Sequence, residues 1–84
     1  MALITGANSG LGLETARVLA SRGATVLLAC RSHQRGEQAR QALLPLARAG
    51  IDVLELDLAD LASVNRAARQ VAEQYGQLDL LINN

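Results

Sequence analysis

The residues best suited to chemistry stand near the start of the chain, in the stretch TGANSGLG from Thr5 to Gly12. Three glycines fall within these eight residues, directly after an apolar run. Glycine in regular structure costs roughly 0.5–1 kcal/mol relative to alanine, so the cluster indicates a backbone that turns tightly or lies close to a ligand. Placed between a strand and a helix, such a turn predicts a phosphate site, because the N–H groups that begin a helix are unpaired and carry partial positive charge.

Each glycine of this turn has its own expected role. Gly6 permits the tight turn off the strand, Gly10 removes a side chain where pyrophosphate would lie, and Gly12 lets the helix pack closely on the strand. Asn8 and Ser9 supply short polar side chains at the mouth of the turn. The phosphate loop of nucleoside triphosphatases ends in Gly-Lys followed by Ser or Thr, and this chain contains no lysine, which excludes that class.

The elements that must position this turn follow a regular alternation. Short apolar runs predict buried strands at residues 2–5, 25–30, 52–56 and 79–83. Between them lie three amphipathic stretches with helical spacing. The chain is therefore expected to be an α/β domain of the order β-α-β-α-β-α-β, a partial doubly wound parallel sheet of the Rossmann type with strand order 3-2-1-4.

The ends of the three helices are also predicted. The first is expected to end at Gly23. Residues at spacings of three and four share one of its faces: Leu11, Thr15, Val18, Leu19 and Arg22. Ser32 is a candidate N-cap for the second helix, which would run to about Ala49 with a kink or an end at Pro45. Asp60 would cap the third, whose apolar stripe ends at Tyr75.

Composition limits the class of protein. Eight basic and eight acidic residues give zero net charge, which argues against a partner bound through a basic surface such as nucleic acid. The single cysteine, Cys30, cannot form an internal disulfide, and no apolar run approaches a membrane span. We expect a cytoplasmic protein without a membrane segment, and no cluster in the sequence predicts a metal site.

Three motifs in this order resemble the short-chain dehydrogenase/reductase family: TGANSGLG, LDLAD (56–60) and LLINN (80–84). The resemblance covers the whole chain and implies that residues 1–84 form the amino-terminal part of a dinucleotide-binding domain. It places Gly6, Asn8, Ser9, Gly10, Leu11 and Gly12 at the pyrophosphate and ribose, Asp57 and Leu58 at the adenine, and Asn83 at the strand edge beside the cofactor. Asp57 and Asn83 have structural alternatives, as a strand-end cap and a turn former.

The end of the second strand bears on the choice between NAD and NADP. An acidic residue there binds the ribose 2′-hydroxyl of NAD, whereas an arginine accommodates the 2′-phosphate of NADP. Here the strand ends in Cys30 and Arg31, with no carboxylate available. A guanidinium binds phosphate in bidentate fashion, so NADP is favoured over NAD, and the alternative for Arg31 is a solvated surface charge. The ACR ending is most similar to the branch of retinol dehydrogenases, WW-domain oxidoreductases and protochlorophyllide reductases.

The catalytic residues that the resemblance implies are missing from this sequence. The family uses a Tyr-x-x-x-Lys pair, and a chain without lysine cannot contain one. Tyr75 is expected in the core, and His33 and Cys30 as non-catalytic residues. The expected function is cofactor binding within an oxidoreductase for a small carbonyl or alcohol substrate, in a whole protein that could be homo-oligomeric; this chain alone is expected to be inactive. The alternatives are a non-catalytic dinucleotide-binding module and a methyltransferase, which would want an acidic residue at the end of the second strand.

Overall fold

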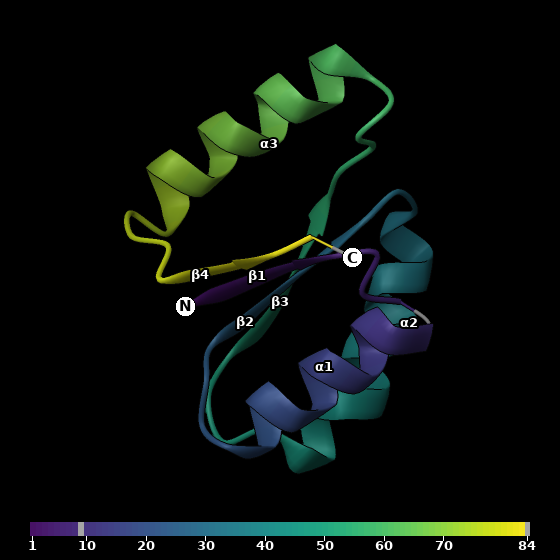
Figure 1. The fold of residues 1–84 in the computed structure, drawn as a ribbon, viewed down its shortest axis with the longest axis vertical. Helices are drawn as coiled ribbons and strands as arrows, with labels where there is room; N and C mark the ends of the chain where they lie inside the picture. The colour runs from purple at the N-terminus through teal and green to yellow at the C-terminus, as the bar shows by residue number, and fades with distance from the viewer. Residues whose placement is uncertain (9, 84) are drawn as a thin grey trace.

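The computed structural model describes residues 1–8 and 10–83 and contains a parallel sheet of four strands in the order β3-β2-β1-β4 (Figure 1). The elements in chain order are β1 (Ala2–Thr5), α1 (Gly10–Ser21), β2 (Val26–Cys30), α2 (His33–Leu43), the 3-10 turn η1 (Leu44–Leu46), β3 (Ile51–Glu55), α3 (Leu61–Gln74) and β4 (Leu80–Ile82). The predicted fold class and strand order are confirmed.

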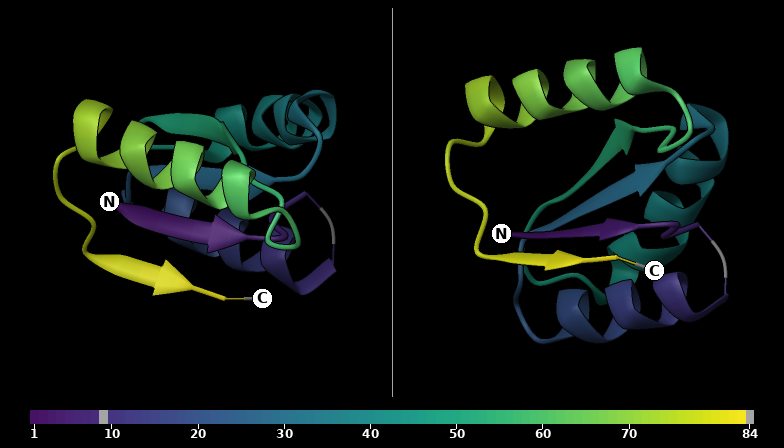
Figure 2. Two further views of the ribbon diagram at one scale, coloured as in Figure 1. Left: turned by 90° about the horizontal axis from the view of Figure 1, so that it is seen from above. Right: turned by 45° about the horizontal axis from the view of Figure 1, so that its top comes forward.

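The sheet separates two layers of helix. Helices α1 and α2 cover one face, and α3 lies alone over the other, as the turned views show (Figure 2). Side chains of β2 alternate between these layers: Val26, Leu28 and Cys30 join the cluster under α1 and α2, while Leu27 and Ala29 join the cluster under α3. This period of two is what a strand buried on both faces requires.

The helix ends follow from local capping. Ser32 Oγ accepts a hydrogen bond from the Arg35 N–H at 3.3 Å, and Asp60 Oδ1 accepts one from the Ala62 N–H at 3.0 Å. Gly23, just past α1, has a φ of +97°, the left-handed conformation that ends helices. Helix α2 stops at Leu43 and continues only as the 3-10 turn that contains Pro45, so the predicted regular helix ends at the proline and not at Ala49.

The face that α1 buries is not the one that the spacing of its leucines marks out. The buried residues are Gly12, Ala16 and Ala20, whereas Leu11 is 72% exposed. Three small residues at spacings of four let the helix axis approach the sheet closely, and this close approach decides which face turns inward. Leucines that flank the small residues, Leu13 and Leu19, then pack partly buried at the rim of the core.

The second face of the sheet is only partly covered. Leu80 and Leu81 of the edge strand β4 are 45% and 53% exposed. A hollow of about 360 Å³ lies between α3 and the sheet, with mainly leucine, valine and alanine side chains in its walls. Among the described residues, no helix combines the length and the apolar character needed to cross a bilayer.

Candidate nucleotide-binding site

An open pocket of about 720 Å³ lies at the carboxyl ends of β1, β2 and β3. Three segments meet there: the turn after β1, the junction of β2 with α2, and the loop between β3 and α3. Its walls comprise Thr5, Gly6, Asn8, Ala29, Arg31, Ser32, Arg35, Leu56, Asp57, Leu58 and Ala59. In open parallel sheets, ligands bind outside this end of the strands, next to the point where the strand order reverses. Here the order reverses at β1, since β2 and β4 lie on its two sides.

The turn between β1 and α1 needs glycine at two positions. Gly6 and Gly10 both have a φ of +59°, which side chains disfavour. A Cβ added at Gly10 would meet no heavy atom within 4 Å, so the space beside the first residue of α1 is open. The start of α1, with its unpaired N–H groups, is therefore accessible to an anion.

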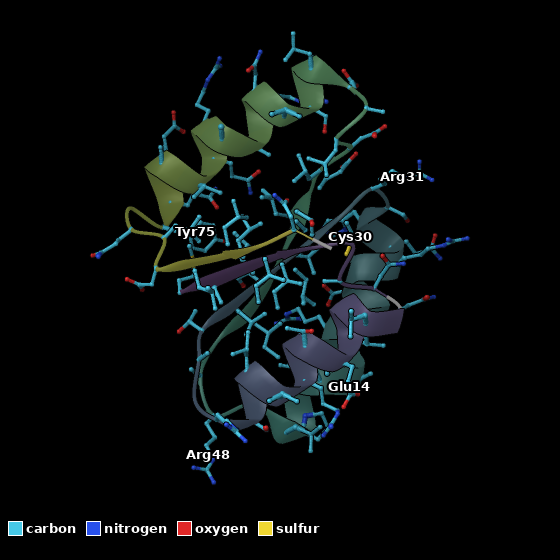
Figure 3. All side chains as sticks on the ribbon, viewed as in Figure 1. Glu14, Cys30, Arg31, Arg48 and Tyr75 are labelled. Carbon is cyan, nitrogen blue, oxygen red and sulfur yellow. The ribbon has the colours of Figure 1, made fainter. Side chains whose placement is uncertain are left out.

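Two arginines lie at the junction of β2 and α2. Arg31 follows the last residue of β2 and points away from the helices into solvent (Figure 3), and Arg35 is the third residue of α2. Both side chains are exposed, and neither forms an ion pair within the described part of the chain. Sequence reasoning identified Arg31 but missed Arg35 and Ser32 as wall residues. The available signal was their position, because Ser32 and Arg35 come within five residues of the end of β2, at the edge of the sheet where ligands bind.

The loop between β3 and α3 is built around Asp57. Its carboxylate Oδ1 accepts a hydrogen bond from the Ala59 N–H at 3.0 Å, and its own N–H donates to Ser63 Oγ at 2.9 Å. Asp57 therefore does cap the strand end, the structural alternative raised from the sequence, and it also lines the pocket. Leu58, 61% exposed, adds an apolar surface beside it.

The remaining residues of the predicted site lie elsewhere or outside the description. Leu11, Gly10 and Gly12 belong to the first turns of α1 and are not wall residues of the pocket. Asn83 follows β4 and lies at the apolar hollow on the α3 side. Ser9 lies outside the described residues. The structure thus brings Gly6, Asn8, Arg31, Asp57 and Leu58 together at one pocket.

Cys30 and Tyr75, the other candidate side chains, make contacts typical of structural roles. Cys30 is 2% exposed, and burial raises the pKa of its thiol, an effect that hydrogen bonds from the backbone N–H groups of Ala7 and Asn8 partly offset. The Tyr75 hydroxyl donates to Asp52 Oδ2 at 3.0 Å; burial, then this bond and the carboxylate charge, raise its pKa. Tyr75 lies at the opposite end of the sheet from Arg31 (Figure 3). Within residues 1–8 and 10–83, no group of three or more His, Cys, Asp or Glu side chains is placed to hold a metal ion.

Comparison with known proteins agrees with this geometry. The model of the short chain dehydrogenase family matches residues 1–84. Retinol dehydrogenase 11 of Mus musculus is 45% identical over 85 residues, which cover 100% of this chain and 27% of that protein. The structure of menthone neomenthol reductase from Mentha piperita superposes with a TM-score of 0.92 at 41% identity, covering 99% of this chain and 30% of that one.

L-sorbose reductase from Gluconobacter frateurii, solved with NADPH and L-sorbose, superposes with a TM-score of 0.89 at 31% identity, covering 99% of this chain and 32% of that one. The chain thus spans less than a third of the length of each of these three relatives. The family model matches all residues of the chain. The parallel sheet in the order 3-2-1-4 and the glycine turn at its carboxyl end agree with that match. This chain belongs to the short-chain dehydrogenase family.

Proposed function

We propose that this chain is the NADP-binding portion of an oxidoreductase that transfers hydride between a nicotinamide and a small carbonyl or alcohol substrate. The observation that carries the proposal is a pair of arginines at the pocket. Arg31 follows the end of β2, where a carboxylate would select NAD, and Arg35 lies in the first turn of α2. The only carboxylate among the described wall residues is Asp57, and it belongs to the loop after β3. The NADPH complex of L-sorbose reductase, a structural neighbour, supports the same cofactor class.

The described residues fit an NADP molecule in three places. The pyrophosphate would lie at the turn from Gly6 to Gly12, where the space beside Gly10 is open. The adenine would lie between the two exposed walls formed by the β2 end and the loop that carries Asp57 and Leu58. The 2′-phosphate would be held by Arg31 and Arg35, with the start of α2 adding its partial positive charge.

The role of this chain in the reaction is binding and orientation. The cofactor supplies the hydride, while the residues named above fix its adenine half against the sheet. A Tyr-x-x-x-Lys pair cannot be formed by these 84 residues, since the sequence holds no lysine. We therefore expect the chain to bind nucleotide without oxidising or reducing a substrate. A non-catalytic dinucleotide-binding module would also bind nucleotide without turnover. The proposed activity and substrate class are therefore argued from the relatives, which are dehydrogenases and reductases.

The test is a calorimetric titration of the chain with NADP and with NAD, beside Arg31→Ala, Arg35→Ala and the double variant. A hydrogen bond to a charged group contributes about 1.5–3 kcal/mol, or roughly 10- to 100-fold in affinity. We expect NADP to bind at least about tenfold more tightly than NAD, with each single variant losing part of the difference and the double variant all of it. Arg48→Ala is the matched control, because Arg48 is also exposed but lies at the far end of the molecule (Figure 3).

The outcomes separate the alternatives. Equal binding of NADP and NAD by the unaltered chain would refute the assignment of the arginines to a 2′-phosphate. Loss of selectivity in Arg48→Ala as well would show a general charge effect and not a local site. Circular dichroism of every variant establishes that the compared chains are equally folded.

A further inference from the structure

Gly36, the fourth residue of α2, lies against the sheet. It is buried, and a Cβ added to it would lie 2.6 Å from Val53 Cγ1 of β3. The same added atom would lie 3.4 Å from Cys30 Sγ and 3.5 Å from Cys30 Cβ of β2. Carbon atoms pack at about 3.5–4.0 Å, so any larger residue at position 36 would force α2 and β3 apart by roughly 0.9 Å or more.

The displacement would fall on the first turn of α2. The later part of the helix is tied down, since Arg40 Nε donates to the Ile51 carbonyl oxygen of β3 at 2.8 Å and Leu43 is buried in the core. Val53 is branched at Cβ and packs, partly buried, against the same core cluster, so rotating its side chain away would cost a preferred rotamer and some of that packing. The beginning of the helix is joined to β2 through Arg31 and Ser32, and the described hydrogen bonds include none from its first turn to β3.

That first turn carries the wall residues of the pocket. The Gly36 N–H donates to the Ser32 carbonyl oxygen at 3.0 Å, and Arg35 is the residue immediately before Gly36. Arg35 and Ser32 both line the pocket. A change in the distance between Gly36 and the sheet therefore moves the Arg35 guanidinium relative to Arg31, whose position is set by the end of β2.

We propose that Gly36 is a positioning residue for cofactor selectivity: the missing side chain seats the start of α2 close to β3 and so keeps Arg35 within reach of the 2′-phosphate beside Arg31. The inference rests on the proposed NADP site. Gly36 touches no cofactor itself. We expect its main effect on the ligand group that distinguishes NADP from NAD, because the helical turn that it seats carries Arg35, whereas Asp57 and Leu58 belong to another segment.

The experiment measures the ratio of the NAD and NADP dissociation constants in four related variants. Gly36→Ala adds the clashing methyl group to the helix, and Val53→Ile enlarges the other side of the same contact. Gly36→Ala combined with Val53→Ala removes the atom that would clash. Val53→Ala alone measures the effect of shortening Val53 by itself. Gly50→Ala is the matched control, since a Cβ there meets only Thr25 Cγ2 at 3.9 Å.

We expect the ratio to fall about fivefold or more in Gly36→Ala and in Val53→Ile, a share of the roughly 10- to 100-fold that a charged hydrogen bond contributes. The dissociation constant for NAD should stay within about twofold throughout, and the combined variant should regain the original ratio. A weaker helix would not explain the loss, because alanine favours a helix more than glycine does.

Each outcome supports or overturns the proposal. An unchanged ratio in a folded Gly36→Ala chain, or a ratio that stays low when Val53 is also shortened, overturns the proposal. If Gly36→Ala does not fold by circular dichroism, Val53→Ile decides in the same way. If the unaltered chain binds both nucleotides without preferring NADP, the proposed NADP site is wrong. If it prefers NADP and Gly36→Ala keeps that preference, only the role of Gly36 is wrong.

Discussion

Ser63→Ala tests how the loop beside the proposed adenine position is held. Ser63 is 5% exposed in the first turn of α3, and its Oγ accepts the hydrogen bond of the Asp57 N–H at 2.9 Å. The substitution removes only that oxygen. The Asp57 N–H then loses its acceptor, while the cap between Asp57 Oδ1 and the Ala59 N–H, 3.0 Å long, is left in place.

The expected size of the effect follows from this burial. A buried donor left without a partner costs about 1–3 kcal/mol, and because this bond is only partly buried we take the lower half, about 1–2 kcal/mol. The greater helix preference of alanine offsets up to about 0.5 kcal/mol of it. The net loss of about 1 kcal/mol lowers the midpoint of thermal unfolding by roughly 4–8 °C in a domain of this size.

Two assays are needed. Thermal unfolding is followed by circular dichroism in a fixed concentration of sucrose, which raises the stability of every variant alike. Calorimetry then measures NADP and NAD binding, and we expect both affinities to fall by the same factor, about three- to tenfold, because the adenine half is common to both. Asn65→Ala is the matched control, since Asn65 is exposed on the same helix, and its unfolding midpoint should stay constant or rise slightly.

The reasoning is wrong if Ser63→Ala lowers the midpoint by less than about 2 °C relative to Asn65→Ala. It is also wrong if the substitution changes only the preference between NADP and NAD. The second result would mean that the loop at Asp57 bears on the 2′-phosphate and not on the adenine.

Three further predictions concern stability and reactivity. The pKa of Tyr75 is raised in the folded chain, so its stabilising effect is full below the unfolded pKa of about 10 and is lost as the pH rises through the folded value; urea unfolding between pH 8 and 11 should show this slope, and Tyr75→Phe should reduce it to the part that the raised pKa of Cys30 contributes. Cys30, 2% exposed and with a raised pKa, should react with an aromatic disulfide reagent at pH 8 only at the rate of local opening, and prompt reaction of the folded chain would contradict its burial. Leu54→Ala, at a residue 1% exposed, should cost about 2–5 kcal/mol. That is a large share of the roughly 4–13 kcal/mol typical of this length, so the variant should show weakened or lost helical dichroism.

Much of the fold could be predicted because its signals are local. Ser32 and Asp60 were identified as caps from their type and position, and both accept the capping hydrogen bond in the structure. Gly23 ends α1 for the reason that its type suggests, and Pro45 ends the regular part of α2. The alternation of four strands with three helices then leaves few topologies, because parallel crossovers are right-handed.

The candidate site was only partly predictable. Gly6 and Arg31 directly follow strands, and Asn8 comes two residues after Gly6. The carboxyl ends of parallel strands meet at one edge, so the convergence of these residues follows from the chain order. Asp57 shows the limit of such reasoning: the sequence left a choice between a cap and a pocket residue, and in the structure one side chain occupies both positions.

The sequence by itself determined the elements, their order, the caps at Ser32 and Asp60 and the turn that needs glycine, since each depends on residues a few positions apart. The tertiary structure decided which side of each helix faces inward. Helix α1 buries Gly12, Ala16 and Ala20 because small residues permit the closest approach to the sheet, which the spacing of its leucines did not show. Gly36 and Arg35 acquire their significance only once α2 packs on β3, because the distance between two elements is a property of both surfaces together and of neither sequence segment alone.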